Sequence, residues 1–264
     1  MRQPSPDMIL RVAGHFGELL QGRIGEDIAL ITLPCDALWV EGRRLPGAFS
    51  VHGPAKVQLR RLLRGASGRF ILRATMPPGG GAGASTAALV AAARLMGETD
   101  PLRIAAACLD VEGASDPLMW PAPERLLWAS RRAAVLERLP PIAGLEVLGG
   151  FVGPPIRTRA ADRHFPDIAD LVARWSGACS DAARLAELAT LSAMRTLALR
   201  GPAGDPTAAL AARHGALGWS IAHTGSARAL LFRPGAVPPL AGADLRAAGF
   251  RHIRQFRVGD RPCS

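Results

Sequence analysis

Residues 76–96 read MPPGGGAGASTAALVAAARLM, a cluster of glycines that leads directly into an alanine-rich apolar segment. The preceding residues 69–75, RFILRAT, alternate polar and apolar side chains and predict a half-buried strand. The alanine-rich residues predict a central helix over 83–97, apolar on nearly every face and closed by Gly97. A glycine loop between a strand and a helix can present bare backbone N–H groups and the positive end of the helix dipole to an anion. We therefore expect a nucleotide phosphate to bind at this loop.

The composition is that of a globular protein with a well-buried core. The chain has 264 residues, of which 48% are hydrophobic, enough for one large domain or two smaller domains that share a cleft. It lacks a run of 18 uncharged apolar residues, and its start, MRQPSPDMIL, lacks the layout of a secretion signal. We expect a cytoplasmic protein with no membrane partner. The cysteines are widely separated and without zinc-type spacing, so we expect them to be reduced and structural: Cys35, Cys108, Cys179 and Cys263.

The net charge of +10 raises the question of nucleic-acid binding. Lys56 is the only lysine, the arginines are scattered, and tyrosine is absent. The chain therefore lacks the alternation of basic and aromatic residues that stacks bases. We expect no nucleic-acid partner, and the charge fits an anionic small substrate equally well.

The residues before the glycine loop predict several strands. Residues 9–13 form a short apolar strand candidate that runs into residues 14–22, GHFGELLQG. The glycines of this segment are consistent with a loop over a ligand or with a hairpin turn that exposes Glu18. Residues 28–33 and 37–40 predict two strands on either side of a break at Pro34.

After the central helix, Asp100 and Pro101 predict an N-cap and first turn for a helix that ends near Val111. Residues 112–120, EGASDPLMW, are rich in helix breakers and predict a loop that carries Glu112 and Asp116. Two carboxylates beside a phosphate loop are suited to a magnesium ion.

The second half of the chain mixes strands and helices without regular alternation, which predicts an α+β fold. We place the domain boundary at the proline-rich residues 139–141, giving domains of residues 1–143 and 144–264. Expected strands are 145–152, 217–222, 229–232 and 251–257, and expected helices are 167–175, 181–200, 206–214 and 240–248.

Three kinds of phosphate loop compete for the glycine segment. A P-loop needs a lysine followed by Ser or Thr after its glycines, and none is present. Residues 79–84, GGGAGA, satisfy the dinucleotide pattern G-x-G-x-x-A, but glycine-alanine runs meet this pattern easily. A glycine loop that ends in Ser85 and Thr86 at a helix start suits ATP, because the hydroxyls are available to a metal ion or a phosphate.

Four motifs together carry a resemblance to a known family. The pattern P-x-G-G-G-x-x-x-S-T-A at Pro77–Ala87 resembles the ATP-binding motif of the GHMP small-molecule kinases. Within that superfamily the chain is most similar to the L-threonine kinases of the propanediol-utilisation and cobalamin branch. The four motifs of that branch match in order along the chain, at residues 17–22, 81–88, 112–116 and 223–226, the second of them overlapping the ATP-binding pattern.

The resemblance implies an N-terminal domain of the ribosomal-protein-S5 type and a ferredoxin-like C-terminal domain, with ATP and a small hydroxyl-bearing substrate between them. It implies transfer of phosphate from ATP with Mg²⁺ in a monomer or homodimer, with L-threonine as the first candidate substrate. Asp116 would be the catalytic residue, and Ser85 and Glu112 would hold the metal. The ATP-binding residues would be Pro77, Gly79, Gly80, Gly81, Gly83, Ser85 and Thr86. The substrate-binding residues would be His15, Glu18, Gln21, Thr224, Gly225 and Ser226.

The chain also departs from the family pattern. Ala84 stands where the family has the first of two adjacent serines, and Ala88 stands where it has an aspartate. The acidic loop carries an extra residue and has Gly113 in place of a proline. These departures leave a second hypothesis open, a nucleotide-binding regulatory protein with impaired catalysis.

Overall fold

The computed structural model describes residues 9–156 and 159–259. The strands are β1 (Leu10–Ile24), β2 (Asp27–Leu45), β3 (Ser50–His52), β4 (Arg69–Ala74), β5 (Leu126–Ala129), β6 (Ala134–Arg138), β7 (Leu145–Phe151), β8 (Gly218–Ile221), β9 (Ala227–Phe232) and β10 (Arg251–Val258). The helices are α1 (Lys56–Leu62), α2 (Ala84–Leu95), α3 (Pro101–Glu112), the short 3-10 helix Pro123–Arg125, α4 (Ala169–Ala173), α5 (Trp175–Ala178), α6 (Ala182–Arg200), α7 (Thr207–Arg213) and α8 (Ala241–Ala247).

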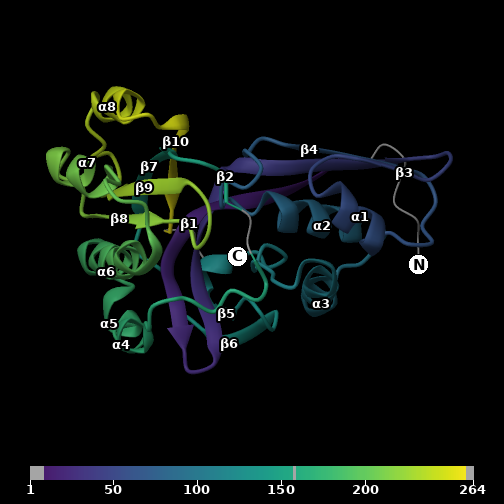
Figure 1. Ribbon diagram of the computed structural model, residues 1–264, viewed down its shortest axis with the longest axis horizontal. Helices are drawn as coiled ribbons and strands as arrows, with labels where there is room; N and C mark the ends of the chain where they lie inside the picture. The colour runs from purple at the N-terminus through teal and green to yellow at the C-terminus, as the bar shows by residue number, and fades with distance from the viewer. Residues whose placement is uncertain (1–8, 157–158, 260–264) are drawn as a thin grey trace.

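Within these residues all the strands belong to one curled sheet. Its order is β10-β7-β9-β8-β1-β2-β4-β3, and β5 pairs with β2 and β6. Helix α2 packs against β1 and β2, α1 and α3 lie beside α2, and α6 packs against β1 and β8 with α4 and α5 below it (Figure 1). The mixture of strands and helices confirms the expected α+β class.

The β1–β2 hairpin corrects two expectations. Residues 14–22, expected to form a loop or turn, lie within β1, and β2 continues through Pro34 without a break. The pairing register shifts between Ala13 and Gly14 and on both sides of Glu18. Such bulges let a strand absorb residues that do not fit a regular ladder. Gly17 has φ of 78° and lies against the backbone of Ile221, so both its conformation and its lack of a side chain matter.

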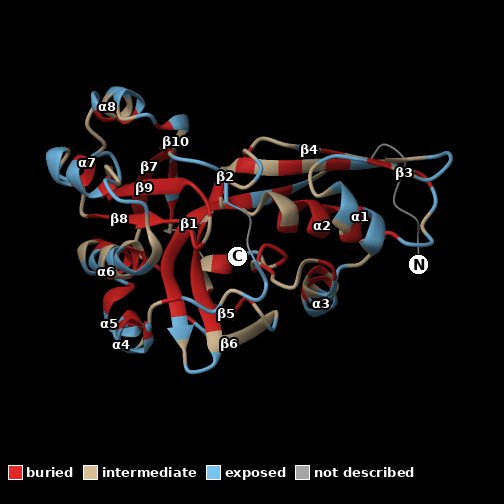
Figure 2. Cartoon of the chain, in the orientation of Figure 1, coloured by how far each residue is buried: buried red, intermediate tan, exposed pale blue. Residues whose placement is uncertain are grey.

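Helix α2 is the buried centre of the first half, as expected from its alanines. Residues 86–93 are all buried, and the helix packs on β1 and β2. Figure 2 shows α2 almost entirely buried, whereas α1 and α3 have exposed outer sides. Gly97 follows the helix with φ of 90°, as the predicted left-handed cap requires. Asp100 caps α3 by accepting a hydrogen bond from the backbone of Leu102.

The elements expected in the second half are present, with bounds that differ by a few residues. Strands β5 and β6 were not among the expected strands. Glu18 of β1 pairs with Ile221 of β8, so the sheet continues from one half into the other. The larger hydrophobic cluster also draws on both halves, including Leu33 and Leu185. The division at residues 143 and 144 stays a prediction.

Three of the cysteines, Cys35, Cys108 and Cys179, are buried free thiols, as expected, and Cys263 lies outside the described residues. Across residues 9–156 and 159–259, no helix combines the length and hydrophobicity needed to cross a bilayer.

Candidate active site

The glycine loop of residues 77–83 packs against the turn of residues 222–226, which joins β8 to β9. The backbone N–H groups of Ser226 and Ala227 donate to the Gly80 carbonyl, at 3.0 and 2.9 Å. A Cβ atom on Gly81 would overlap the carbonyl oxygen of Thr224, and one on Gly225 would lie 2.5 Å from the Gly81 nitrogen. Loop and turn therefore form a close seam, which brings together residues expected to contact ATP and residues expected to contact substrate.

A buried ion pair holds this turn in place. Arg228 donates to Asp205 at 2.7 Å and to the carbonyls of Gly225 and Ala227 at 3.2 and 3.0 Å. The side chains of Arg228 and Asp205 are only 6% and 4% exposed. Burial opposes ionisation of Asp205, but hydrogen bonds from Thr207 and Arg228 outweigh it and hold the pKa of this carboxyl below its usual range. The seam is therefore stabilised by the buried Arg228–Asp205 pair, which was not among the predicted site residues.

The start of α2 offers unpartnered donors to an anion. Gly83 precedes the helix with φ of 73° and supplies no side-chain cap. The N–H groups of the first turn have no intrahelical acceptor. A Cβ atom on Gly83 would lie 2.6 Å from the His15 ring, so the loop passes directly over β1. Backbone hydrogen bonds hold the rest of the loop in place. The Pro77 carbonyl accepts from the Gly80 backbone, and the Gly79 carbonyl accepts from the Ile156 backbone.

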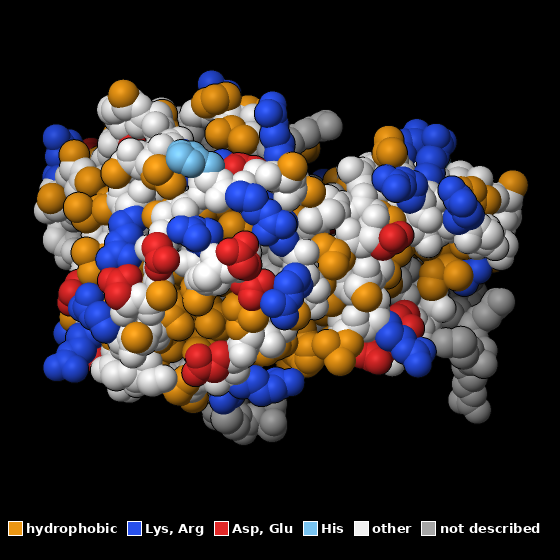
Figure 3. All heavy atoms as spheres, turned by 60° about the horizontal axis from the view of Figure 1, so that its bottom comes forward, with side chains coloured by type: hydrophobic (Ala, Val, Ile, Leu, Met, Phe, Trp, Pro, Cys, Tyr) orange, Lys and Arg blue, Asp and Glu red, His pale blue; other side chains and the backbone are white. Residues whose placement is uncertain are grey.

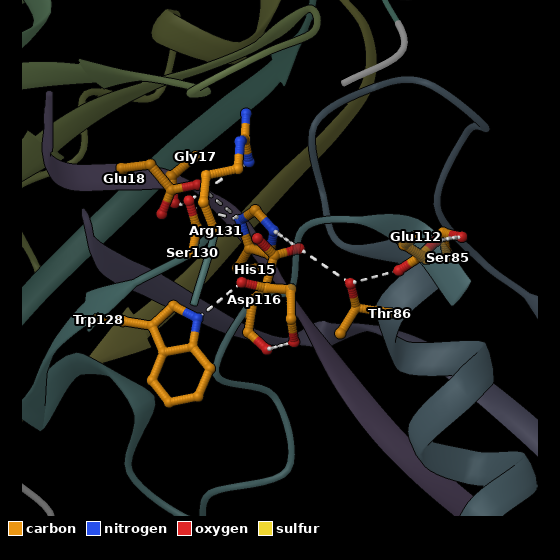
Figure 4. A network of polar contacts seen from close by, with 11 residues as sticks. His15, Gly17, Glu18, Ser85, Thr86, Glu112, Asp116, Trp128, Ser130 and Arg131 are labelled. Carbon is orange, nitrogen blue, oxygen red and sulfur yellow. Dashed lines mark hydrogen bonds and ion pairs between the residues drawn. The ribbon is translucent and has the colours of Figure 1, made fainter. Parts of the chain in front are cut away.

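Hydroxyl and carboxylate groups meet beside this helix start (Figure 4). Ser85 donates to Glu112, and Thr86 lies 3.2 Å from Glu112 and 3.4 Å from Asp116. Asp116 lies on a loop, as expected, but Glu112 is the last residue of α3, so the expectation of a loop at Glu112 is wrong. The helix continues to Glu112 because Gly113, with φ of 71°, provides the left-handed C-cap.

Glu112 is partly buried, and burial favours the protonated form of its carboxyl group. This effect raises the pKa of this carboxyl to about 7, against the opposing hydrogen bond from Ser85. A cation beside Glu112 would favour the charged form, so the site is suited to a metal ion that arrives together with phosphate.

His15 links Asp116 to Glu18. Its Nε2 atom lies 3.3 Å from Asp116, and its Nδ1 atom lies 3.5 Å from Glu18 and 3.3 Å from the Gly17 carbonyl. Burial disfavours charge on the ring, but the carboxylates of Glu18 and Asp116 outweigh it and raise the pKa of His15 to about 9. His15 therefore holds its proton more tightly than a free imidazole does.

Asp116 is both ionised and accessible. Burial opposes its ionisation, but the charge and hydrogen bond of His15 outweigh this and lower the pKa of Asp116. Its side chain is 26% exposed, whereas that of His15 is 3% exposed. A ligand can therefore reach the Asp116 carboxylate but cannot reach past it to the imidazole.

Gln21 does not join this network. Its side-chain amide donates to the Ile221 carbonyl at 3.1 Å, and its backbone exchanges hydrogen bonds with the Ser192 hydroxyl. These contacts tie β1 to β8 and α6.

The sequence analysis did not identify the β5–β6 turn as part of the site. The Trp128 indole donates to the Ser115 carbonyl at 2.6 Å, and the Ser115 backbone donates to the Ser130 carbonyl at 2.9 Å. These bonds fix the loop that carries Asp116 and bring Arg131 beside it. The short apolar run 126–129, LLWA, was the available signal for this strand.

The residues at the start of α2 fit ATP and Mg²⁺. The uncapped first turn is suited to phosphate, and the Ser85 hydroxyl and Glu112 carboxylate are oxygen ligands of the kind that Mg²⁺ prefers. The described residues contain no group of three or more His, Cys, Asp or Glu side chains placed to hold a metal ion. Mg²⁺ is usually held by one or two carboxylates together with phosphate oxygens of the substrate.

The buried His15–Glu18 pair predicts a specific dependence of stability on pH. Burial raises the pKa of Glu18 to about 8 from 4.5, and the pKa of His15 is raised to about 9 from 6.5. Both groups hold protons more tightly in the folded chain, so their stabilisation is complete below the unfolded pKa values and is lost as the pH rises through the folded ones. We expect the free energy of unfolding, measured in urea, to fall between about pH 5 and pH 9.

In a Glu18→Gln variant this fall should be shallower, because no carboxylate is left to bind the proton or to raise the pKa of His15. A Glu187→Gln variant, altered at an exposed carboxylate of α6, should keep the slope of the unmodified protein. Equal slopes in all three proteins would contradict the assignment.

Comparison with known proteins reveals a shared fold. No protein-family model matches this chain, and no curated protein matches it. Mevalonate kinase from L. major, in complex with R-mevalonate, has a TM-score of 0.66 at 14% identity, covering 97% of this chain and 98% of that one. Homoserine kinase from Cytophaga hutchinsonii has a TM-score of 0.58 at 16% identity, covering 99% and 98%. Mevalonate kinase from Methanococcus jannaschii has a TM-score of 0.64 at 10% identity, covering 97% and 98%.

The chain thus has the fold of these kinases over nearly its full length. This confirms the expected GHMP-kinase-like fold in its overall form. The finer description of the two halves, as ribosomal-protein-S5-type and ferredoxin-like, stays a prediction.

Proposed function

We propose that this protein is an ATP-dependent kinase that phosphorylates a hydroxyl group of a small molecule, with L-threonine or a similar hydroxy amino acid as the first candidate. The observation that carries the proposal is the meeting of Ser85, Thr86, Glu112 and Asp116 at the open first turn of α2. The fold shared with mevalonate and homoserine kinases supports it. The four motifs that resemble those of L-threonine kinases support the choice of substrate.

The chain's own residues have distinct tasks in this proposal. The backbone N–H groups of the first turn of α2 bind phosphate oxygens, and Ser85 and Glu112 hold the metal. Bound Mg²⁺ would neutralise charge on the transferring phosphoryl group. Asp116 accepts the proton of the substrate hydroxyl, and His15 orients this carboxylate and keeps it ionised.

Most of the proposed binding residues keep the roles that the family resemblance implies. Pro77, Gly79, Gly80, Gly81, Gly83, Ser85 and Thr86 surround ATP, and Thr224, Gly225 and Ser226 face the substrate, whereas the buried residues His15, Glu18 and Gln21 support the substrate site from behind. The domains 1–143 and 144–264, a monomeric or homodimeric state and a cytoplasmic location belong to the same proposal.

The release of ADP from Mg²⁺-ATP tests the activity directly, with L-threonine, L-serine and L-homoserine as acceptors. We expect release above the acceptor-free rate with at least one of them. Binding of ATP without turnover of any acceptor would instead favour the second candidate, a nucleotide-binding regulatory protein. The observation behind that candidate is the alanine at positions 84 and 88, where the resembling kinases carry a hydroxyl and a carboxylate.

The dinucleotide pattern at residues 79–84 gives a third ligand to compare. ATP should raise the melting temperature more than NAD at equal concentration, because stabilisation follows the ratio of ligand concentration to Kd. A larger shift with NAD would remove ATP as the ligand.

Gly81→Val should weaken ATP binding strongly. The new side chain would overlap the Thr224 carbonyl and the Ala222 side chain, and it would occupy a position with φ of 74° that valine avoids. The loop would then separate from its seam and lose its alignment with α2. Calorimetric titration with ATP should show a Kd higher by about tenfold or more, given the cost of strained backbone at such a position.

Gly65→Val is the matched control, since Gly65 also has positive φ but has open space around its Cβ position, away from the loop. Valine at this positive φ should lower the stability of the variant, but the Kd for ATP should stay unchanged. Equal Kd values for the Gly81→Val variant and the unmodified protein would show that the loop does not shape the nucleotide site.

A further inference from the structure

A large open cavity lies next to the candidate active site, at the tip of the β1–β2 hairpin. Its volume is about 890 Å³. Its walls are the hairpin tip, the β5–β6 turn, residues 163–166 ahead of α4 and Leu199 of α6. Figure 3 brings this side of the molecule forward and shows arginine and carboxylate side chains gathered close together there. Its basic lining consists of Arg23, Arg131, Arg132, Arg163 and His164.

Hydrogen bonds hold the walls in place. The backbone of Arg23 donates to the Pro166 carbonyl at 2.7 Å, and its carbonyl accepts from Ile168 at 3.0 Å. Arg132 donates to both oxygens of Asp27, at 2.9 and 3.1 Å, and so joins the β5–β6 turn to the hairpin. Arg200 donates to the His164 carbonyl at 2.9 Å and ties the third wall to α6. Hydrogen bonds between separate elements of the fold therefore fix the walls of the cavity.

The positive charge of the cavity is only partly neutralised. Glu26 and Asp27 are the carboxylates in its lining, and Asp27 is occupied by Arg132. Among the described residues, Arg23, Arg131 and Arg163 form no ion pair, and their hydrogen bonds to carbonyl or hydroxyl oxygens are 3.3 to 3.4 Å long. The Nε atom of Arg131 is buried and has no hydrogen-bond partner. Arginine groups with free donors are typical partners of carboxylate and phosphate.

The ring of His223 lies in the same positively charged region as these arginines. His223 stacks on Phe165, a residue of the cavity wall, with ring centroids 4.1 Å apart, and neither ring nitrogen has a hydrogen-bond partner. Burial, together with the nearby charge of Arg131, lowers the pKa of His223 to about 3. The histidine is thus neutral, and the guanidinium groups supply the charge of this region.

Arg131 joins the cavity to the reacting end of the site. It follows Ser130, whose carbonyl accepts from Ser115, the residue before Asp116. The cavity extends from there along β1 to Arg23, five residues beyond Glu18, a separation of at most about 17 Å at the rise of a strand. Arg131 thus lies at the end of the cavity nearest Asp116, and a group bound by Arg23 and Arg163 at the hairpin tip lies well away from a hydroxyl placed at Asp116.

We propose that this arginine cavity binds an anionic group at the far end of the phosphate acceptor, so that the acceptor is an extended hydroxy compound with a terminal carboxylate or phosphate. The proposal rests on the proposed kinase function for the identity of the ligand as acceptor. It adds a substrate class, since free L-threonine is too short to reach from Asp116 to Arg23.

The first test measures anion binding without turnover. Isothermal titration with inorganic phosphate and, separately, with glutarate distinguishes a phosphate from a carboxylate as the preferred group, with neither nucleotide nor magnesium present. We expect binding of at least one anion, weakened about tenfold or more in Arg131→Gln and in Arg163→Gln, since each variant loses charge-assisted hydrogen bonds. Arg73→Gln, altered at an exposed arginine of β4, should bind as the unmodified protein does. Equal affinity in all four proteins, or no binding, would overturn the proposal.

The second test measures turnover with the tripeptide L-threonyl-glycyl-glycine and its C-terminal amide, which differ by one charge. We expect KM to be lower for the acid by about tenfold, with similar kcat, and this difference to disappear in Arg163→Gln. Turnover with no preference for the acid would overturn the cavity assignment and leave the kinase in place. Anion binding that depends on Arg163, without turnover of any acceptor, would uphold the cavity as an anion site and overturn the kinase.

Discussion

Asp116→Asn should lower kcat by a factor of about 10²–10⁴, the usual contribution of a positioned general base. Asparagine keeps the size of the side chain and its contacts with His15 and Thr86, but it cannot take the proton of a substrate hydroxyl. Because the removed interaction acts mainly in the transition state, the Kd for ATP should change little. Steady-state kinetics with the best acceptor of the panel, together with calorimetric titration of ATP, measures both quantities.

Asp110→Asn is the matched control for this experiment. Asp110 lies on α3, six residues before Asp116, and is exposed. Its substitution should leave kcat and KM unchanged. If Asp116→Asn and Asp110→Asn have the same kcat as the unmodified protein, Asp116 is not the base.

Asp205→Ala should lower the free energy of unfolding by about 3–5 kcal/mol, the usual cost of leaving one charge of a buried pair alone. The variant leaves the guanidinium of Arg228 buried without its carboxylate, and it also removes the N-terminal hydrogen bond to the backbone of Thr207. Because Arg228 holds the carbonyl of Gly225, the seam with the glycine loop should loosen as well. Urea unfolding measures the loss of stability.

The surface pair of Asp170 and Arg195 provides a comparison with the same chemistry. Its two hydrogen bonds, at 2.6 and 2.7 Å, are as short as the single one of the buried pair, but the side chains of Asp170 and Arg195 are 58% and 36% exposed. Asp170→Ala should therefore cost no more than about 1 kcal/mol. Similar losses in Asp205→Ala and Asp170→Ala would show that burial of the Asp205 pair has no special role.

The local structure around α2 could be predicted because its determinants lie close together in the sequence. The alternation in residues 69–75, the apolar alanines and Gly97 each specify a conformation within a few residues. The capping of α3 by Asp100 is equally local. The meeting of Ser85, Glu112 and Asp116 is less local, and it was expected from the family resemblance together with two carboxylates close to the phosphate loop.

Other features depended on contacts between distant residues. The segment at residues 14–22 looks like a loop because of its glycines, yet it pairs with β2 and β8 and becomes a strand with bulges. Glu112 looked like part of a loop because Gly113 follows it, but that glycine ends the helix one residue later. The arginine cavity joins residues about 100 positions apart, and no pattern within one segment indicates it.

The seam between the glycine loop and the β8–β9 turn gives the glycines of the motif a structural role that does not depend on catalysis. Gly81 and Gly225 are each required by the close approach of two backbones, whether or not a phosphate is ever bound. Selection for folding alone would preserve them after selection for catalysis had ceased. In this lineage an intact glycine motif therefore shows only that the fold is preserved. Preserved activity is indicated instead by Asp116 and Glu112, which no close approach of two backbones requires.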